Sequence, residues 1–366
     1  MMQLSWKSKP LLVAGVFVAV SVFIGYRQTH KDYFDYLTMS GATPLAIARR
    51  VPSDFRLEID GLVKKHYRFS GDALNALAAT RIRTREITPR GVFQGAYIHV
   101  GIPVFNILEG IAPLKPDQAA FAQPLDILVT FHSASGAKVY FSFNELIMTG
   151  DCQPPTLAFN RTPLLPTNEN VRAAYTGNRF TEALTGFRLI CPREPDTARY
   201  LENVVRISYR VIPIRAEDLP PRRKKFRCRS EAITCIDGSG RKPGVFDAVA
   251  RQTRDHWLRI GHGHGYDDIA TAQGRNLRAF LEANFPGAGR EDFFLFAACD
   301  GYRALFSGRE IFATADGAAM MIVERLNAKL PPEGYMLAPT KDFFADRAMW
   351  GLARVVRIRS ETIRSL

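Results

Sequence analysis

The segment at residues 261–268, GHGHGYDD, gathers the side chains best suited to chemistry. His262 and His264 are two residues apart, so in an extended segment both imidazoles point to the same side, and Asp267 follows within reach. Two imidazoles and a carboxylate can hold a divalent metal such as zinc. The glycines would equally let backbone amides approach an anion, and a flexible glycine loop with solvated histidines also fits the pattern. His262, His264 and Asp267 are therefore the candidate metal ligands.

The chain contains five cysteines: Cys152, Cys191, Cys228, Cys235 and Cys299. The number is odd, so at least one thiol is unpaired. Cys228 and Cys235 are close enough in sequence to close a small loop, and Cys152 and Cys191 form a second plausible pair inside one expected domain. Buried free thiols are the alternative, because sequence does not show which pairs reach bonding distance. Cys299 is expected as a small buried apolar residue. No CxxC motif occurs, which excludes a zinc ribbon or a thioredoxin-type site.

Short strands separated by turns are expected to position these side chains. Residues 55–63 alternate apolar and polar side chains as a half-buried strand does, and Ser70 is a candidate N-cap for a helix over 70–79. A helix at 104–111, strands at 127–133 and 138–143, and a closing strand at 204–212 complete an α+β domain. His132 and Arg199 fall on expected strands, where a structural hydrogen bond or ion pair is the favoured role.

The same order of segments then recurs. Residues 276–284 repeat the amphipathic pattern of 103–110, and residues 293–312 repeat that of 127–147. Gly136 and Glu145 have the same spacing as Gly301 and Glu310. Cys191-Pro192, Arg199 and VVRI at 204–207 are echoed by Ala338-Pro339, Arg347 and VVRI at 355–358. The pattern predicts a tandem repeat divided near 214–229, with chance similarity of hydrophobic patterns as the alternative.

Composition limits the classes of protein and partner. With 46% hydrophobic and 11% aromatic residues, the body is expected to be globular. The net charge of +13 is scattered, except for RRKKFRCR at 222–229, which follows two prolines. We interpret 216–230 as a basic linker between a first domain at 50–215 and a second at 231–366. A docking patch for anionic lipid or an acidic protein is the alternative, and a nucleic-acid partner is not expected.

Residues 11–25, LLVAGVFVAVSVFIG, form the most apolar run of the chain, between Lys7 and Lys9 before it and Arg27 and Lys31 after it. About 20 residues cross a bilayer, a length the run reaches with its flanking residues. We expect residues 1–32 to be an uncleaved membrane anchor. A cleaved signal peptide is disfavoured because no A-x-A-like site follows, and a buried core helix is the remaining alternative. The prediction is a single-pass protein of the inner membrane with its body in the periplasm; the flanking charges leave the orientation open.

Several stretches resemble a known family. LEIDGLV, FSGDALNAL, GIPVFNILEG, FNEL, LAFNRTPLL and RLICPREPDTARYLENVVRISY in the first repeat, and more faintly CDGYRALFSGREIF and GYMLAPTKD in the second, resemble the molybdopterin-binding domain of sulfite oxidase and methionine-sulfoxide-reductase type oxidoreductases. The resemblance implies two tandem α+β domains with mixed, barrel-like sheets and peripheral helices. In active members it implies a buried pterin whose molybdenum is held by a cysteine thiolate. It also implies a cofactor pocket at Arg83, Arg85, Thr88, Arg90 and His99, with basic residues on the protein surface as the alternative.

The sequence departs from that family at the metal ligand. The thiolate would fall near 87–90 in the first repeat and near 261–264 in the second, and neither stretch contains a cysteine. A soft molybdenum–dithiolene centre needs such a ligand. The N-terminal MMQLSWKSKP also lacks the arginine pair of the signals that export folded, cofactor-loaded proteins. Both observations predict that no cofactor is bound.

The functional expectation follows from the two departures. We expect a membrane-anchored extracytoplasmic binding or accessory protein, cofactor-free, that acts with a membrane or periplasmic protein partner. The alternative is an active molybdenum-pterin oxidoreductase with an unconventional metal ligand that passes electrons to a membrane partner. A zinc site at His262 and His264 is a third, separate expectation.

Overall fold

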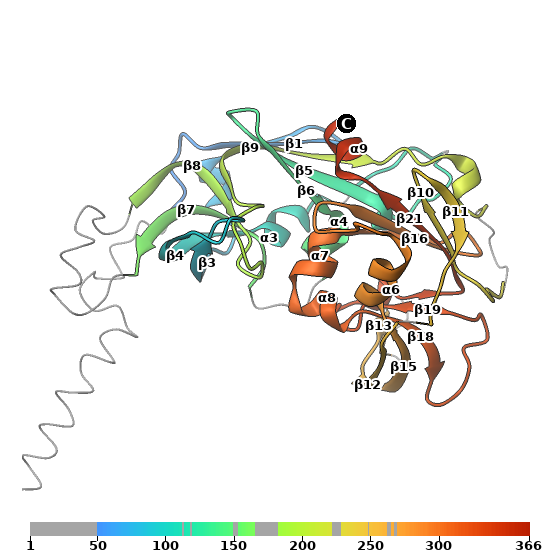
Figure 1. Cartoon of the computed structure of the whole chain (residues 1–366). Helices are drawn as coiled ribbons and strands as arrows, with labels where there is room; N and C mark the ends of the chain where they lie inside the picture. The colour runs from blue at the N-terminus through green and yellow to red at the C-terminus, as the bar shows by residue number, and fades with distance from the viewer. Residues whose placement is uncertain are drawn as a thin grey trace, which may run out of the picture.

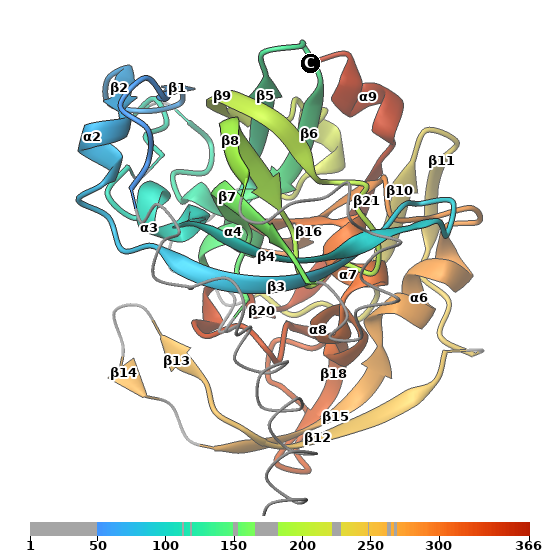
Figure 2. The same ribbon diagram turned by 90° about the vertical axis from the view of Figure 1, so that its left-hand side faces the viewer.

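The computed structural model describes residues 50–111, 113–117, 119–148, 153–164, 182–221, 228–247, 249–261, 265–266 and 269–366. Within those ranges, no helix has the length and apolar character needed to cross a membrane. The expected anchor at 11–25 lies outside the described residues, so it stays a prediction. The described chain is a mixed α+β structure with curled sheets (Figures 1 and 2).

Two halves of the chain fold through the same succession of strand pairings. In the first half, the strands are β1 (Arg56–Gly61), β2 (Tyr67–Ser70), β5 (Ile127–Ser133), β6 (Lys138–Ser142) and β9 (Leu201–Val211). Strand β1 pairs with β2 antiparallel and with β9 parallel, and β5 lies antiparallel between β9 and β6.

The second half repeats this arrangement with β10 (Thr234–Asp237), β11 (Gly240–Pro243), β16 (Phe293–Ala298), β17 (Arg303–Ser307) and β21 (Leu352–Ile358). Strand β10 pairs with β11 antiparallel and with β21 parallel, and β16 lies antiparallel between β21 and β17. A parallel strand pairing therefore falls at the same place in each half.

A second group of strands also has matching members. In the first half, the order is β8 (Glu182–Ile190), β7 (Thr156–Pro163), β4 (Phe93–Pro103) and β3 (Thr80–Ile87), which completes a nine-stranded sheet. In the second half, the order is β12 (Arg251–Trp257), β15 (Ala270–Asn276), β18 (Met321–Leu326), β19 (Met336–Ala338) and β20 (Met349–Trp350), and these form a separate sheet. A small hairpin, β13 (Ile260–Gly261) with β14 (Gly265–Tyr266), stands apart.

Two glycines mark the correspondence most sharply. Gly101 on β4 and Gly274 on β15 each sit at a break in strand register, against β7 and β18 respectively. A Cβ atom at Gly101 would meet the Leu157 carbonyl oxygen at 2.4 Å, and one at Gly274 would meet the Ile322 carbonyl oxygen at 2.0 Å. The neighbouring backbone comes so close that only glycine fits at either position.

Helices follow the hairpins in both halves. They are α2 (Gly71–Leu74), α3 (Val104–Leu108), α4 (Phe143–Ile147), α6 (Leu277–Asn284), α7 (Gly308–Ala313), α8 (Ala315–Ala319) and α9 (Ser360–Arg364). Single 3₁₀ turns lie at η3 (Pro124–Asp126), η4 (Ala216–Asp218) and η5 (Ala345–Arg347). Helices α4 and α7 begin alike, because Ser142 and Ser307 each accept a hydrogen bond from the backbone of a glutamate three residues later, Glu145 or Glu310.

The structure tests several local predictions. Strand β5 coincides with the predicted 127–133, and Ser70 caps α2 by accepting from the Ala73 amide at 3.3 Å. The predicted helices at 70–79 and 104–111 were too long, since α2 ends at Leu74 and α3 at Leu108. Residues 109 and 110 are Glu-Gly, and glycine disfavours continuation of a helix.

The halves share buried surface. Leu128 and Ile212 of the first half pack with Ile236, Leu295 and Leu305 of the second. Phe121, Leu125 and Met148 of the first half belong to the main core of the second. Figure 1 shows α4 and α7 between the strands of the two halves. Ion pairs also lie in this region.

Candidate functional site

The arginines predicted for a cofactor pocket lie on the outer face of an edge strand. Strand β3 lies at the edge of the nine-stranded sheet (Figure 2). The side chains of Arg83 and Arg85 on this strand are exposed. Thr88 and Arg90 belong to the turn that joins β3 to β4. The Thr88 hydroxyl accepts the Val92 amide at 3.1 Å, so this group shapes the turn.

His99 lies on the opposite face of the same hairpin, fully buried. Its cross-strand partner is Ile82, and side chains alternate along β3, so His99 faces Glu86 instead of Arg83 and Arg85. The His99 Nε2 atom is 3.0 Å from Glu86 Oε1, while Arg188 donates to both oxygens of that carboxylate at 3.0 and 2.8 Å. The structure therefore does not bring His99 together with the predicted arginines.

We call Glu86, His99 and Arg188 the hairpin ion cluster. Burial lowers the pKa of His99, so its imidazole is neutral at pH 7. Burial by itself would raise the pKa of Glu86, but hydrogen bonds from His99 and Arg188 outweigh it and hold the pKa below its ordinary value. The charged carboxylate thus balances the Arg188 guanidinium inside the protein. His99 Nδ1 makes no hydrogen bond within the described residues.

The candidate metal ligands His262, His264 and Asp267 lie outside the described residues, so zinc at this position stays a prediction. Their described neighbours, Gly261 and Gly265, pair in the β13–β14 hairpin. Elsewhere in the described ranges, no group of three or more histidine, cysteine, aspartate or glutamate side chains is placed to hold a metal ion.

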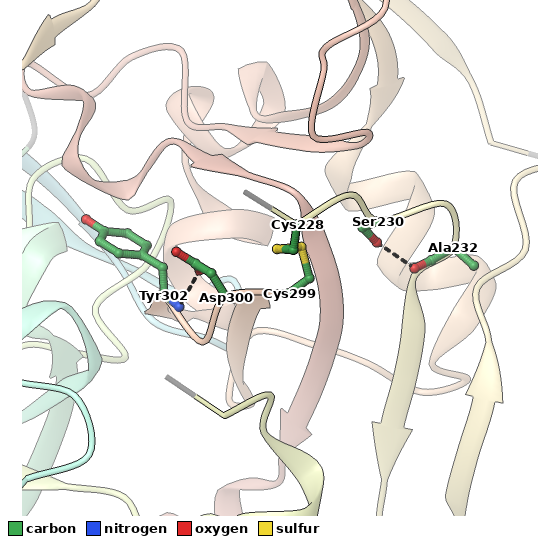
Figure 3. The surroundings of a disulfide bond; sticks show 6 residues. All are labelled: Cys228, Ser230, Ala232, Cys299, Asp300 and Tyr302. Carbon is green, nitrogen blue, oxygen red and sulfur yellow. Dashed lines mark hydrogen bonds between the residues drawn. A yellow bond between two sulfur atoms is a disulfide. The ribbon is translucent and has the colours of Figure 1, made fainter. Parts of the chain in front are cut away.

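Both suggested cysteine pairings were wrong, whereas the alternative of buried free thiols holds for Cys191 and Cys235. Cys228 is bonded to Cys299, with their Cα atoms 5.9 Å apart, and Cys191 and Cys235 are free and buried. Figure 3 shows the bond between the segment that enters the second half and the turn after β16. Cys235 cannot meet Cys228 because its side chain points from β10 into the core of the second half. Cys299 is therefore a cross-link and not a simple apolar residue.

The free described cysteines do not fit a molybdenum ligand. Cys191 is packed in the core of the first half, and burial raises the pKa of its thiol well above the ordinary value. Burial also raises the pKa of Cys235 to about 12. Both therefore remain protonated, whereas a metal takes the thiolate. Cys228 and Cys299 are consumed by the disulfide, which leaves Cys152, outside the described residues, as the only other cysteine.

Matching ion pairs meet between the halves. Arg199 donates to Glu145 at 2.9 and 3.3 Å and to Glu194 at 2.6 Å. In the second half, Arg347 donates to Asp342 at 2.6 and 2.7 Å and lies 2.6 Å from Glu310. The structural role predicted for Arg199 is thus confirmed, but Arg199 lies in the turn before β9 and not on a strand as predicted. Arg347, its counterpart in the repeat, has the same contact: each arginine binds the glutamate that follows the hairpin of its own half.

These two ion pairs also contact each other. Ser307 of the second half donates to Glu145 of the first at 2.8 Å, and Arg309 donates to Glu194 at 3.2 Å. Glu145, Arg199 and Glu310 line a cavity of about 30 Å³, and Arg199, Ser307 and Arg309 line a second cavity of about 220 Å³. Burial raises the pKa of Glu310 to about 7, with the nearby charge of Glu145 adding to the effect. Glu310 can therefore hold a proton, while both cavities are smaller than the range of about 300–1,000 Å³ that is typical of ligand pockets.

His132 has the structural role expected of it. It lies on β5, and its Nε2 atom is 2.8 Å from the Ser208 hydroxyl. Burial, with the nearby Arg206, lowers the pKa of His132 to about 4, so the ring is neutral at pH 7.

A much larger hollow lies on the second half, with a volume of about 610 Å³. We call it the strand groove. Its walls come from β12, β15, β18 and two chain segments, residues 229–231 and 330–335. Most of its lining is polar, and the lining residues are Arg229, Ser230, Glu231, Arg251, Gln252, Thr253, Gln273, Gly274, Glu324, Arg325, Leu330, Pro331, Gly334 and Tyr335.

Sequence reasoning missed the strand groove because its side chains come from three strands and two loops that no short motif unites. The only available signal was the repeat itself, which placed residues 276–284 opposite 103–110 and so placed the preceding strands in matching positions. The inter-half ion pairs had a clearer signal, since Glu145, Glu310, Arg199 and Arg347 all belong to the repeated segments.

Comparison with known proteins gives little further information. No family model matches the chain. No curated protein matches it either. Among solved structures, it is similar to the sulfane dehydrogenase SoxCD from Paracoccus pantotrophus, with 14% sequence identity and a TM-score of 0.28. The match covers 78% of this chain and 64% of the SoxCD chain. A similarity at this TM-score carries no argument about fold or function.

Proposed function

We propose that this protein is a membrane-anchored, extracytoplasmic binding or accessory protein, built from two tandem units of the molybdopterin-binding type without the cofactor. The observation that carries the proposal is the state of the cysteines. Two are joined in a disulfide and two are buried thiols with raised pKa values, so none of the four is suited to bind molybdenum.

The tandem arrangement is supported by the matching strand pairings and by the glycines at equivalent register breaks. Between the units, ion pairs fill most of the space and leave cavities of about 30 and 220 Å³. Such an interior favours a scaffold over a reaction chamber. Fold alone does not fix function, so the proposal depends on these sites.

The disulfide supports the proposed location. Disulfides persist in oxidising compartments such as the bacterial periplasm and are rare in the cytoplasm. The bond joins Cys228 and Cys299, 71 residues apart, and so constrains a large loop. With the apolar segment at 11–25, it favours a body on the periplasmic side of the inner membrane, where a membrane or periplasmic protein would be the partner.

Molybdenum and pterin analysis of the full-length protein, purified from its native membrane, tests this proposal. We expect neither molybdenum nor pterin fluorescence in proportion to the chain. One molybdenum and one pterin per chain would overturn the proposal. In that event a Cys152→Ser variant would show whether the remaining cysteine is the ligand, because it would lose the metal.

A further inference from the structure

The strand groove has the size of a small-molecule site. Its volume of about 610 Å³ lies within the range of about 300–1,000 Å³ that is typical of ligand pockets. The floor is formed by β12, β15 and β18, which are consecutive neighbours in one sheet. Regular strands hold side chains more precisely than loops do, which favours a preformed site.

Positive charge is in excess in the strand groove. Of the groove's two carboxylates, Glu324 binds Arg275 at 2.9 Å and Glu231 lies 3.6 Å from Arg229. Arg251 and Arg325 remain without a carboxylate partner among the described residues. Arg325 makes one long contact of 3.5 Å, to the Ala328 carbonyl oxygen. Two guanidinium groups are therefore available to an incoming anion.

Uncharged donors lie beside these arginines. Thr253 on β12 and Gln273 on β15 line the groove, and neither side chain makes a hydrogen bond within the described residues. Gln252, in contrast, is fully engaged, because it donates to Met320 at 3.1 Å and accepts from Asn276 at 3.0 Å. Gln252 therefore helps to hold the groove in shape, while Thr253 and Gln273 can donate hydrogen bonds to a ligand.

One rim of the strand groove is apolar. Tyr335 stacks on Phe246 with ring centroids 5.1 Å apart, which fixes the tyrosine ring at the groove wall. Leu330, nearby in the same segment, is 64% exposed. A flat organic group could cover both side chains while an attached anion contacts the arginines.

The wall opposite the strands is anchored at two points. The Ser230 amide donates to the Glu333 carbonyl oxygen at 2.8 Å, and Ser230 forms a parallel bridge with Gly334. Two residues before Ser230, Cys228 is bonded to Cys299 (Figure 3). The disulfide therefore fixes the segment that carries Arg229 and Ser230 into the groove.

We propose that the strand groove binds a small organic anion, either a phosphate monoester or a carboxylic acid, with a flat apolar portion. Arg251 and Arg325 bind the anionic group, with Thr253 and Gln273 as further donors, and Tyr335 and Leu330 contact the apolar portion. This inference rests on the proposed function as a binding protein and names the class of ligand.

Calorimetric titration of the full-length protein in detergent tests the site, with phenyl phosphate and benzoate as probes of the two anions and phenol as the neutral control. We expect at least one anionic probe to bind with one site per chain, and phenol not to bind. Removal of a charge-assisted hydrogen bond should weaken binding about tenfold in Arg251→Gln and in Arg325→Gln. Both side chains are exposed, so the variants should fold normally.

Arg81→Gln provides the matched control, since Arg81 is an exposed strand arginine of the other half and should leave binding unchanged. The inference would be overturned if both groove variants bound the anion as tightly as the native protein, if the control variant weakened binding as much as the groove variants, or if neither anion bound. These failures are separate from those of the proposed function. If the protein contains no molybdenum and binds neither anion, only the proposed groove ligand is rejected. If the protein contains stoichiometric molybdenum and binds an anion, only the cofactor-free function is rejected.

Discussion

The β3–β4 region of the first half and the β12–β15 region of the second occupy matching positions in the repeat but use polar side chains in opposite ways. In the first half, Glu86, His99 and Arg188 form a closed ion cluster beneath the hairpin. The residue that corresponds to His99 in the second half is Ala272, since each lies two residues before the glycine at the break in strand register. Ala272 is buried and apolar. Beside it the arginines face an open groove.

The difference shows how one backbone plan can support two roles. A buried charge must be paired inside the protein, so the polar groups of the hairpin ion cluster are used within the fold, and the cluster is closed to ligands. An exposed arginine costs little in stability and keeps its hydrogen-bonding capacity for a ligand. We make four predictions, in decreasing order of expected effect, that test the structural roles assigned to the two halves.

Removal of the central carboxylate of the hairpin ion cluster should have the largest effect. Glu86→Ala leaves the buried Arg188 with only the exposed Glu202, 2.6 Å from its Nε atom, as a carboxylate partner among the described residues. Loss of one member of a buried ion pair costs about 3–5 kcal/mol in the free energy of unfolding, and the contact with Glu202 places the expected cost at the lower end of that range. Urea denaturation of the full chain in detergent measures the change. Glu58→Ala, which removes a half-exposed partner of Arg68, is the control and should cost less than about 1 kcal/mol. Equal costs for the two variants would show that the cluster is not closed.

Loss of the disulfide should have the next largest effect. The double variant Cys228→Ser, Cys299→Ser should lower the free energy of unfolding by about 2–4 kcal/mol, because the unfolded chain regains the freedom of a large loop. Reductant should destabilise the native protein and leave the double variant unchanged. Peptide mapping without reductant gives an independent check, and a peptide that links Cys228 to Cys235 would contradict the structure.

The paired glycines test whether the two regions share one backbone plan. Gly101→Ala and Gly274→Ala should each cost about 1–3 kcal/mol, because each new methyl group would overlap a carbonyl oxygen of the next strand. The exposed Gly238→Ala, where a Cβ meets nothing within 4 Å, is the control and should be close to neutral. A large cost at only one of the two strand glycines would argue against equivalent positions.

The smallest effect concerns pH and the ion pairs between the halves. The pKa of Glu310 is raised to about 7 from an ordinary value of 4.5, so the folded state holds more protons than the unfolded state between these values. Stability should therefore fall as pH rises from about 4.5 to 7. Asp342, whose pKa burial also raises, contributes to the same fall, while Arg347 opposes it.

Glu310→Gln should reduce that fall and leave the share due to Asp342. Melting temperatures of the full chain at pH 5 and pH 8, measured for the native protein and the variant, provide the readout. An identical pH dependence in both proteins would show that Glu310 does not titrate in this range.

The sequence predicted the elements that depend on local signals. Strand β5 and the cap at Ser70 follow from alternation and from the preference of serine for helix starts. The matching roles of Arg199 and Arg347 were also visible as a repeated pattern. These features need only neighbouring residues or a comparison of two segments.

Features that depend on side-chain direction and on contacts between distant segments could not be predicted from the sequence. Closeness in sequence suggested Cys228 with Cys235, but the direction of a side chain on β10 decides against it. Arg83 and His99 looked like parts of one pocket, yet alternation and strand register place them on opposite faces. The strand groove could be predicted only if the neighbouring strands were known, and no single segment of the sequence shows which strands are neighbours.

Hydrogen exchange of the full-length protein with and without phenyl phosphate is the most direct test of whether the second half contains a binding groove and the first half a closed ion cluster. We predict slower exchange only in the second half, in peptides that cover β12, β15 and residues 229–231 and 330–335. Peptides that cover β3 and β4 should exchange at the same rate in both conditions. Slower exchange on the β3–β4 hairpin, with β12 and β15 unchanged, would contradict the assignment of a closed cluster to one half and a binding groove to the other.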